Sequence, residues 1–304
     1  MKEVVVYQMG KVGSAALVKS INESPAEITA HHSHYLTPKT FHALVNRFSD
    51  PNMSDLELQH TIGQLRNNLL LHNKLKRYQM SPKLDAADLG FITLARHPLD
   101  WYFSNLKQNL KFFEENLINW LKFQGFKAEG NELTVEDFQK FMEVLFQTYL
   151  EVVDDMQADP MAQVVQASRK AAETQEGRRF RFIYGQVGTM MRAHYWFDEH
   201  FQPLFEMSIY DLPFDAKKGV AFGASRGCKI LFLKFEQLTE NEKTVGDFCG
   251  IDGFELKRHN ESKDKSAASI IDEARKMAAI PTGFLDLFMS SRYARTFYPT
   301  PEAQ

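Results

Sequence analysis

Short apolar runs alternate along the chain with longer stretches in which apolar residues recur at helical spacing. The first run, Val4–Tyr7, consists of β-branched and aromatic residues, which favour a parallel strand buried on both faces. A loop that contains Gly10 and Gly13 follows, and residues 15–18 open a helix. Three later runs predict further strands: residues 28–30, 91–94 and 229–235.

Helical periodicity fills the segments between these strands. Pro38 and Pro98 stand where a proline can occupy the first position of a helix. Thr134 and Asp137 have the spacing of a capping box, and the aromatic and aliphatic residues behind them form a stripe that faces a core. We therefore predict helices at the following places: from residue 37, and over 55–78, 98–120, 135–153, 190–205 and 245–249.

The order of these elements predicts an α/β fold in which helices cover both faces of a mostly parallel central sheet. With 304 residues, 44% of them hydrophobic, the chain is long enough to bury a substantial core in one domain that spans residues 1–304. We expect a large helical insertion over residues 101–205. Within it, residues 159–177 fit either a loop or an exposed helix, and residues 180–184 fit a short strand.

Composition and charge narrow the functional classes. The formal net charge of −3 gives no overall basic field, so nucleic acid is not expected as a partner. The absence of a leader pattern and of long apolar runs favours a cytoplasmic protein without an integral membrane segment. Cys228 and Cys249 lack the spacing of a zinc site, and we expect both to be reduced, partly buried thiols.

The loop after the first strand is the first candidate for binding chemistry. Residues 8–14 lie between a strand and a helix, where backbone N–H groups and the helix dipole favour an anion. Lys11 adds a positive charge and Ser14 a hydroxyl donor. The loop is not of the Walker A type, because its lysine precedes the second glycine. Taken alone, these residues also fit a tight turn with an exposed lysine.

A second candidate pairs Arg96, at the end of the third predicted strand, with Ser104, eight positions later on the following helix. A guanidinium at the carboxyl end of a strand and a hydroxyl about two turns into the next helix can converge on one phosphate. As an isolated pair, a surface arginine and a helical serine explain the same pattern.

Together and in this order, the two candidates resemble the sulfotransferase superfamily. Lys11-Val12-Gly13-Ser14 matches the Lys-x-Gly-Ser/Thr loop that holds the 5′-phosphosulfate of the donor, and Arg96 with Ser104 matches the pair that holds its 3′-phosphate. Residues 231–238 look like the late strand motif, in which Tyr-Glu-Asp-Leu follows apolar residues. The resemblance implies 3′-phosphoadenosine 5′-phosphosulfate (PAPS) as the donor substrate, no required metal, and a three-layer fold like that of the P-loop kinases.

The resemblance also implies an acceptor with a hydroxyl group. We expect a carbohydrate or glycolipid, because residues 196–229 are similar to bacterial proteins grouped with capsular polysaccharide sulfotransferases. Lys11 would neutralise the departing phosphate, and a neutral histidine or a carboxylate must take the proton of the acceptor. His32 and His34 resemble the His-x-His of uronosyl 2-O-sulfotransferases, and either is a candidate base. Polar loop histidines, or part of a metal site, are the alternatives.

The chain departs from the superfamily at two of these positions. Ala15 stands where many members have threonine or serine, and His97 where many carbohydrate-directed members have aspartate. A basic cluster lies at residues 178–181 and consists of Arg178, Arg179 and Arg181. Three roles are compatible with it: a solvated charged edge, a contact with an acidic sugar chain, and a contact with the donor. The full donor-binding set that the resemblance implies is Gly10, Lys11, Val12, Gly13, Ser14, Ala15, Arg96, Ser104, Arg258 and Lys263.

Two other functions remain compatible with these patterns. A kinase that uses a nucleoside triphosphate shares the implied fold, although the sequence offers neither a Walker A loop nor a clear magnesium-binding carboxylate. A non-catalytic nucleotide-binding protein would explain Ala15, because alanine removes one donor to phosphate.

Overall fold

The computed structural model describes residues 1–34, 36–38, 41, 45, 55–80, 89–127, 130–174, 177, 180–257 and 265–299. The described residues form two compact units. The first draws on residues 1–96 and 195–259, and the second on residues 97–194 and 260–304. Within the described part of the chain, no helix combines the length and the apolar character needed to cross a membrane.

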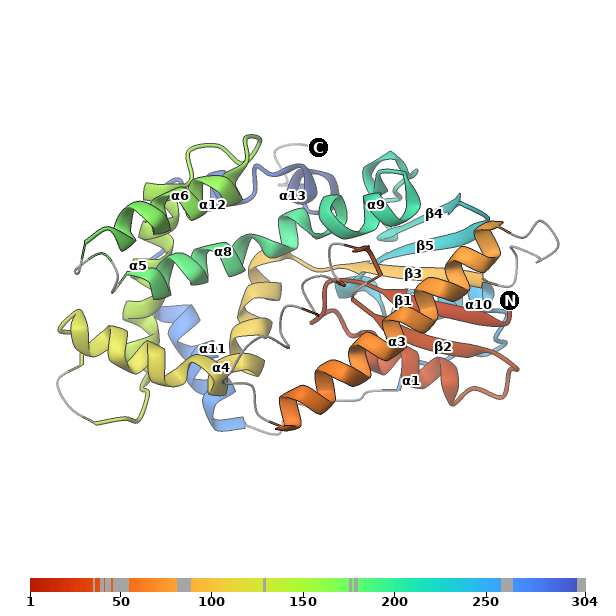
Figure 1. The fold of residues 1–304 in the computed structure, drawn as a ribbon, viewed down its shortest axis with the longest axis horizontal. Coiled ribbons are helices and arrows are strands. Elements are labelled where there is room, and N and C mark those ends of the chain that lie inside the picture. Colours follow the sequence, from red (N-terminus) through yellow and green to blue (C-terminus); the bar gives the residue numbers. More distant parts are fainter. Residues whose placement is uncertain are drawn as a thin grey trace. The chain divides into compact units, whose positions relative to one another are not determined.

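The first unit is built on a five-stranded sheet with the strand order β2-β1-β3-β5-β4 (Figure 1). All neighbouring strands are parallel except β4, which pairs with β5 in the antiparallel direction. The central strands are apolar on both faces, as a sheet covered on both sides requires. The strands are β1 (Glu3–Tyr7), β2 (Thr29–Ser33), β3 (Leu89–Ala95), β4 (Val220–Ser225) and β5 (Cys228–Lys234). The predicted α/β fold with a mostly parallel sheet is therefore confirmed.

The strand order places a topological switch between β1 and β3. From β1 the chain adds β2 on one side, and β3 then pairs with the other side of β1. In open α/β sheets, ligands bind in the crevice outside the carboxyl ends of the strands at such a point. Residues 8–13 follow β1 and Arg96 follows β3, so both predicted binding elements leave the sheet there.

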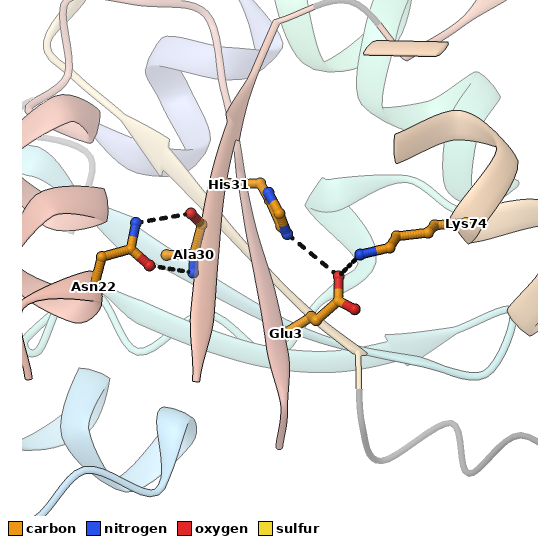
Figure 2. Close-up of polar contacts among 5 residues, drawn as sticks. All are labelled: Glu3, Asn22, Ala30, His31 and Lys74. Atoms are coloured by element: carbon orange, nitrogen blue, oxygen red, sulfur yellow. Dashed lines mark hydrogen bonds and ion pairs between the residues drawn. The ribbon is translucent and has the colours of Figure 1, made fainter. Parts of the chain in front are cut away.

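Two helices of the first unit hold the edge strand β2. Asn22, at the end of α1, accepts a hydrogen bond from the Ala30 N–H at 2.7 Å and donates one to the Ala30 carbonyl at 3.0 Å (Figure 2). The long helix α3 crosses the sheet (Figure 1), and Ser33 of β2 donates a hydrogen bond to Asn68 of this helix at 2.5 Å. The helices of this unit include α1 (Ser14–Asn22), α3 (Asp55–Met80), α9 (Gln202–Phe205) and α10 (Glu242–Cys249).

The second unit is helical. Pro98 occupies the first turn of α4, and Thr134 with Asp137 forms the predicted capping box at the start of α5. Arg275 binds Asp100 at 2.6 Å and lies over the ring of Phe103, which ties the first turns of α4 to α11. Its helices are α4 (Pro98–Phe123), α5 (Val135–Val152), α6 (Pro160–Ala172), α8 (Arg181–Trp196, whose last two residues belong to the first unit), α11 (Lys265–Met277), α12 (Phe284–Phe288) and α13 (Arg292–Phe297).

Several local predictions need correction. Residues 181–184 begin α8 rather than a strand, because Ile183 and Val187 are buried at helical spacing. The ambiguous segment 159–177 contains a helix, α6. The sequence did not predict β4, and the second strand runs on to Ser33, so that His31 and His32 lie within it.

The helical region is also larger than the expected insertion. Helices α11 to α13 lie in the second unit together with α4 to α6, although strands β4 and β5 of the first unit come between the two groups in the chain. Of the helix predicted from residue 37, most residues lie outside those that the structure describes. Cys228 and Cys249 are free and buried, as expected.

Candidate anion-binding site at the carboxyl edge of the sheet

The loop that follows β1 contains three residues with left-handed backbone conformation. The φ angles are 84° at Gly10, 58° at Lys11 and 75° at Gly13. Turns of this kind can gather backbone N–H groups around an anion. The side chain of Val12 is fully buried, so this residue can offer a ligand only its backbone.

Gly13 allows the loop to enter α1. Its carbonyl accepts the first helical hydrogen bond, from Leu17 N–H at 3.1 Å. A β-carbon at this position would lie 2.8 Å from the ring of Phe235, and its φ angle disfavours any other residue type. Both the backbone and the neighbouring side chain therefore require glycine.

Arg96 connects this loop to the turn after β5. Its Nη1 donates a hydrogen bond to the carbonyl of Lys11 at 2.7 Å, and its guanidinium lies 4.6 Å from the centre of the Phe235 ring. Three segments that are far apart in the sequence thus meet at the switch point. Burial lowers the pKa of Lys11 to about 8, so its ammonium is less strongly favoured than that of an exposed lysine.

Gln8, the first residue after β1, joins the loop to α1 and β2. Its side chain is fully buried, and its Oε1 accepts a hydrogen bond from the N–H of Gly10. Its Nε2 donates to Ser14 Oγ at 2.7 Å and lies 2.9 Å from His32 Nε2. The sequence analysis did not predict a role for Gln8. The one indication in the sequence was that a polar residue directly follows a buried strand.

The contacts of His32 define its chemical state. An amide nitrogen only donates, so the Nε2 of His32 must accept from Gln8, and Ser14 Oγ lies 3.0 Å from the same nitrogen. Much of the residue reaches solvent, but this end of the ring is turned into the network. Loss of hydration, followed by the nearby His34, lowers the pKa of His32 to about 4.

His34 is held differently. Its Nδ1 lies 2.5 Å from the carbonyl oxygen of Gln8, which only accepts, so Nδ1 carries the proton. Burial lowers the pKa of His34, the Gln8 bond opposes this, and Lys11 lowers it again. The neutral ring therefore has its lone pair on Nε2. The rings of His34 and His32 meet edge to face at 4.4 Å, so the structure brings the predicted pair together.

His31 belongs to the opposite face of the sheet. Its Nε2 lies 3.3 Å from Glu3, whose carboxylate also binds Lys74 of α3 at 2.6 Å (Figure 2). Alternation along β2 separates His31 from His32, and the Glu3 contact gives His31 a structural role.

The remaining predicted residues have varied positions. Ala15 is exposed at the start of α1, and Arg181 is exposed at the start of α8. Ser104 is half-buried on α4 in the second unit, whereas Arg96 ends a segment of the first, so their pairing stays a prediction. Four further candidates lie outside the described residues: Arg178, Arg179, Arg258 and Lys263.

Comparison of the chain with protein-family models, with curated proteins and with solved structures gives no match. Among the side chains that the structure describes, no three histidine, cysteine, aspartate or glutamate residues are grouped so that they could hold a metal ion.

Proposed function

We propose that this protein is a sulfotransferase that moves the sulfuryl group of PAPS to a hydroxyl of a carbohydrate or glycolipid, on a three-layer fold like that of the P-loop kinases. One observation carries the proposal: Arg96 contacts both Lys11 and Phe235. Lys11 and Arg96 belong to segments that resemble the donor-binding motifs of the sulfotransferase superfamily, and Phe235 belongs to a segment that resembles its late strand motif. Their meeting at the switch point supports a common ligand.

Lys11 and the loop amides would bind the 5′-phosphosulfate. A guanidinium has five N–H donors in a planar fork, so Arg96 can brace the Lys11 carbonyl and also bind a phosphate. In the transfer, the acceptor oxygen forms a bond to sulfur while the bond from sulfur to the bridging oxygen breaks. Lys11 stabilises the negative charge that develops on the departing adenosine 3′,5′-bisphosphate.

His34 is the better candidate for the general base. The Nε2 of His32 already accepts a hydrogen bond from Gln8, so its lone pair is engaged. The bond from His34 Nδ1 to the Gln8 carbonyl fixes the tautomer whose Nε2 can take a proton from a hydroxyl. A β-carbon at Gly10 would lie 3.6 Å from the His34 ring, which places this ring against the loop that would bind the sulfate.

Calorimetric titration with adenosine 3′,5′-bisphosphate tests the donor class. We expect binding that Lys11→Ala weakens by roughly ten-fold or more, the effect of losing a charge-assisted hydrogen bond. Lys19→Ala, which removes an exposed lysine from the last turn of α1, is the matched control. Binding of ATP with magnesium in place of the bisphosphate would favour a kinase, and binding of neither would refute a nucleotide site.

Turnover separates an enzyme from a nucleotide-binding protein. Release of the bisphosphate from PAPS in the presence of a panel of saccharides should depend on His34, and His34→Ala should leave bisphosphate affinity unchanged. His31→Ala, on the opposite face of the sheet, should retain turnover. Bisphosphate binding without turnover on any saccharide would favour the non-catalytic alternative.

A further inference from the structure

One hydrogen-bond network joins the loop after β1 to α1 and β2, and its direction can be followed from atom to atom. The N–H of Gly10 donates to Oε1 of Gln8, so turning this amide over would set two donors against each other. The Nε2 of Gln8 then faces two acceptors, Ser14 Oγ at 2.7 Å and His32 Nε2 at 2.9 Å. The orientation of one buried amide therefore sets the direction of the whole network.

The lone pair of His32 Nε2 has two possible donors. Ser14 Oγ lies 3.0 Å from this nitrogen, and Gln8 Nε2 lies 2.9 Å from it. The side chain of Gln8 is fully buried, so an amide hydrogen without an acceptor would cost free energy and could not turn to water. A hydroxyl can rotate toward another acceptor. Gln8 therefore takes the lone pair of His32, and the proton of Ser14 is left to a different acceptor.

We propose that Gln8 is a positioning residue that turns the hydroxyl proton of Ser14 toward the anion in the loop. The inference rests on the proposed function for the identity of this anion, the 5′-phosphosulfate of PAPS. Ser14 is the first residue of α1, and the first turn of this helix, all of which the structure describes, contains no acidic residue that could take the proton. The hydroxyl therefore favours an oxyanion whose oxygens carry no proton, as in a sulfate ester or a fully ionised phosphate.

The amide is decisive because the same residues could otherwise pair differently. Without Gln8, Ser14 would donate to His32 Nε2 over the 3.0 Å that separate them, as a serine and a neutral histidine do in many sites. Its proton would then be lost to the ligand. Gln8 thus acts on the ligand through Ser14.

The tautomer of His32 is the first test, and it needs no ligand. Nitrogen-15 NMR of the full chain labelled at histidine should show His32 with a proton on Nδ1 and none on Nε2 at neutral pH, with the signals assigned from His32→Gln. In Gln8→Glu, a carboxylate oxygen replaces the amide donor, so Nε2 should become protonated. A proton on Nε2 in the unchanged protein would overturn the proposal, whether or not any variant folds.

A double-mutant cycle tests the consequence for binding. Ser14→Ala should weaken calorimetric binding of adenosine 3′,5′-bisphosphate roughly ten-fold in the unchanged protein. In Gln8→Glu, whose carboxylate accepts the proton of Ser14, the same change should have an effect of less than about two-fold. Each comparison is made within one background, so the charge added by Gln8→Glu cancels. Gln166→Glu, at an exposed position of α6, adds the same charge and should leave the ten-fold effect in place.

Inorganic sulfate separates this inference from the proposed function. Its oxygens carry no proton at neutral pH, and it can occupy the loop without the nucleotide. Sulfate binding that shows the same coupling between Gln8 and Ser14, without any binding of the bisphosphate, would refute the nucleotide donor and support the positioning role. An equal effect of Ser14→Ala on bisphosphate binding in both backgrounds would overturn the positioning role and leave the donor class intact. Binding of neither ion would overturn both.

Discussion

The Nη1 of Arg96 donates a hydrogen bond to the carbonyl oxygen of Lys11 over 2.7 Å, across 85 positions of the sequence. Lys11 has a left-handed backbone, a conformation that costs a residue with a side chain about 1–2 kcal/mol. The hydrogen bond helps to hold the loop in this conformation. Arg96 therefore stabilises the loop before any ligand binds.

Arg96→Lys should loosen this loop although it keeps the positive charge. Lysine lacks the planar fork that bonds the Lys11 carbonyl and stacks on Phe235. Amide hydrogen exchange in residues 9–13 should become faster, with unchanged exchange in β3. Adding Lys11→Gly should recover part of the protection, because glycine adopts the left-handed conformation without strain. Equal protection in the protein and in Arg96→Lys would contradict the bracing role.

Gly13→Ala should destabilise the protein more than the same change at Gly125. Both glycines have φ angles near 75°, so both substitutions introduce backbone strain of about 1 kcal/mol or more. A β-carbon at Gly13 also meets the Phe235 ring, whereas one at Gly125 meets open space. Urea unfolding of the two variants measures the difference directly. Equal losses would mean that the contact with Phe235 relaxes without cost.

Gln8→Leu should lower the free energy of unfolding by about 1–3 kcal/mol, the effect of leaving a buried polar group unsatisfied. Leucine is similar in size but cannot accept from Gly10 or donate to Ser14. The exposed Gln147 on α5 gives a matched control, and Gln147→Leu should change stability little. A Gln8→Leu variant as stable as the control would show that the network around Gln8 has little net effect.

His194 should make the protein less stable as the pH falls. Burial, and then the nearby His97, lower the pKa of His194 to about 3 from an ordinary value of 6.5. Between these values the unfolded chain binds more protons, so the free energy of unfolding decreases with falling pH, by up to about 1.4 kcal/mol per pH unit for this group. Urea unfolding from pH 7 to pH 5 should show a flatter dependence in His194→Gln.

Ser291→Ala is the control for this dependence. It removes the hydroxyl that lies 2.7 Å from His194 Nδ1 but keeps the titrating ring. The variant should be less stable at every pH and retain the steep dependence. A His194→Gln variant with the slope of the unchanged protein would assign the acid sensitivity to other groups.

Local patterns in the sequence predicted much of the fold. The apolar run at β1, the proline at the start of α4 and the capping box at Thr134 each depend on neighbouring residues, and each appears in the structure. The edge strand β4 was missed because Gly223 and Ser225 interrupt the β-branched pattern that marks the central strands. Short apolar runs such as 180–184 fit a strand and a helix equally well.

The candidate site was predicted only in part for a related reason. The His-x-His pattern grouped His32 with His34, and their rings do meet edge to face in the structure. The roles of Gln8 and Phe235 depend on contacts with segments far away in the chain, and no local spacing encodes those contacts. A buried polar side chain directly after a strand is the one signal that could have identified Gln8.

The affinity for adenosine 3′,5′-bisphosphate should fall above pH 8 if Lys11 binds it. Burial lowers the pKa of Lys11 to about 8, so the lysine loses its positive charge as the pH rises through this value, and affinity decreases by up to about ten-fold per pH unit. Lys11→Arg keeps its charge over the whole range and should bind with an affinity that is nearly constant from pH 7.5 to 9.5. Lys19→Arg should behave like the unchanged protein. A constant affinity in the unchanged protein would show that the bisphosphate binds away from Lys11.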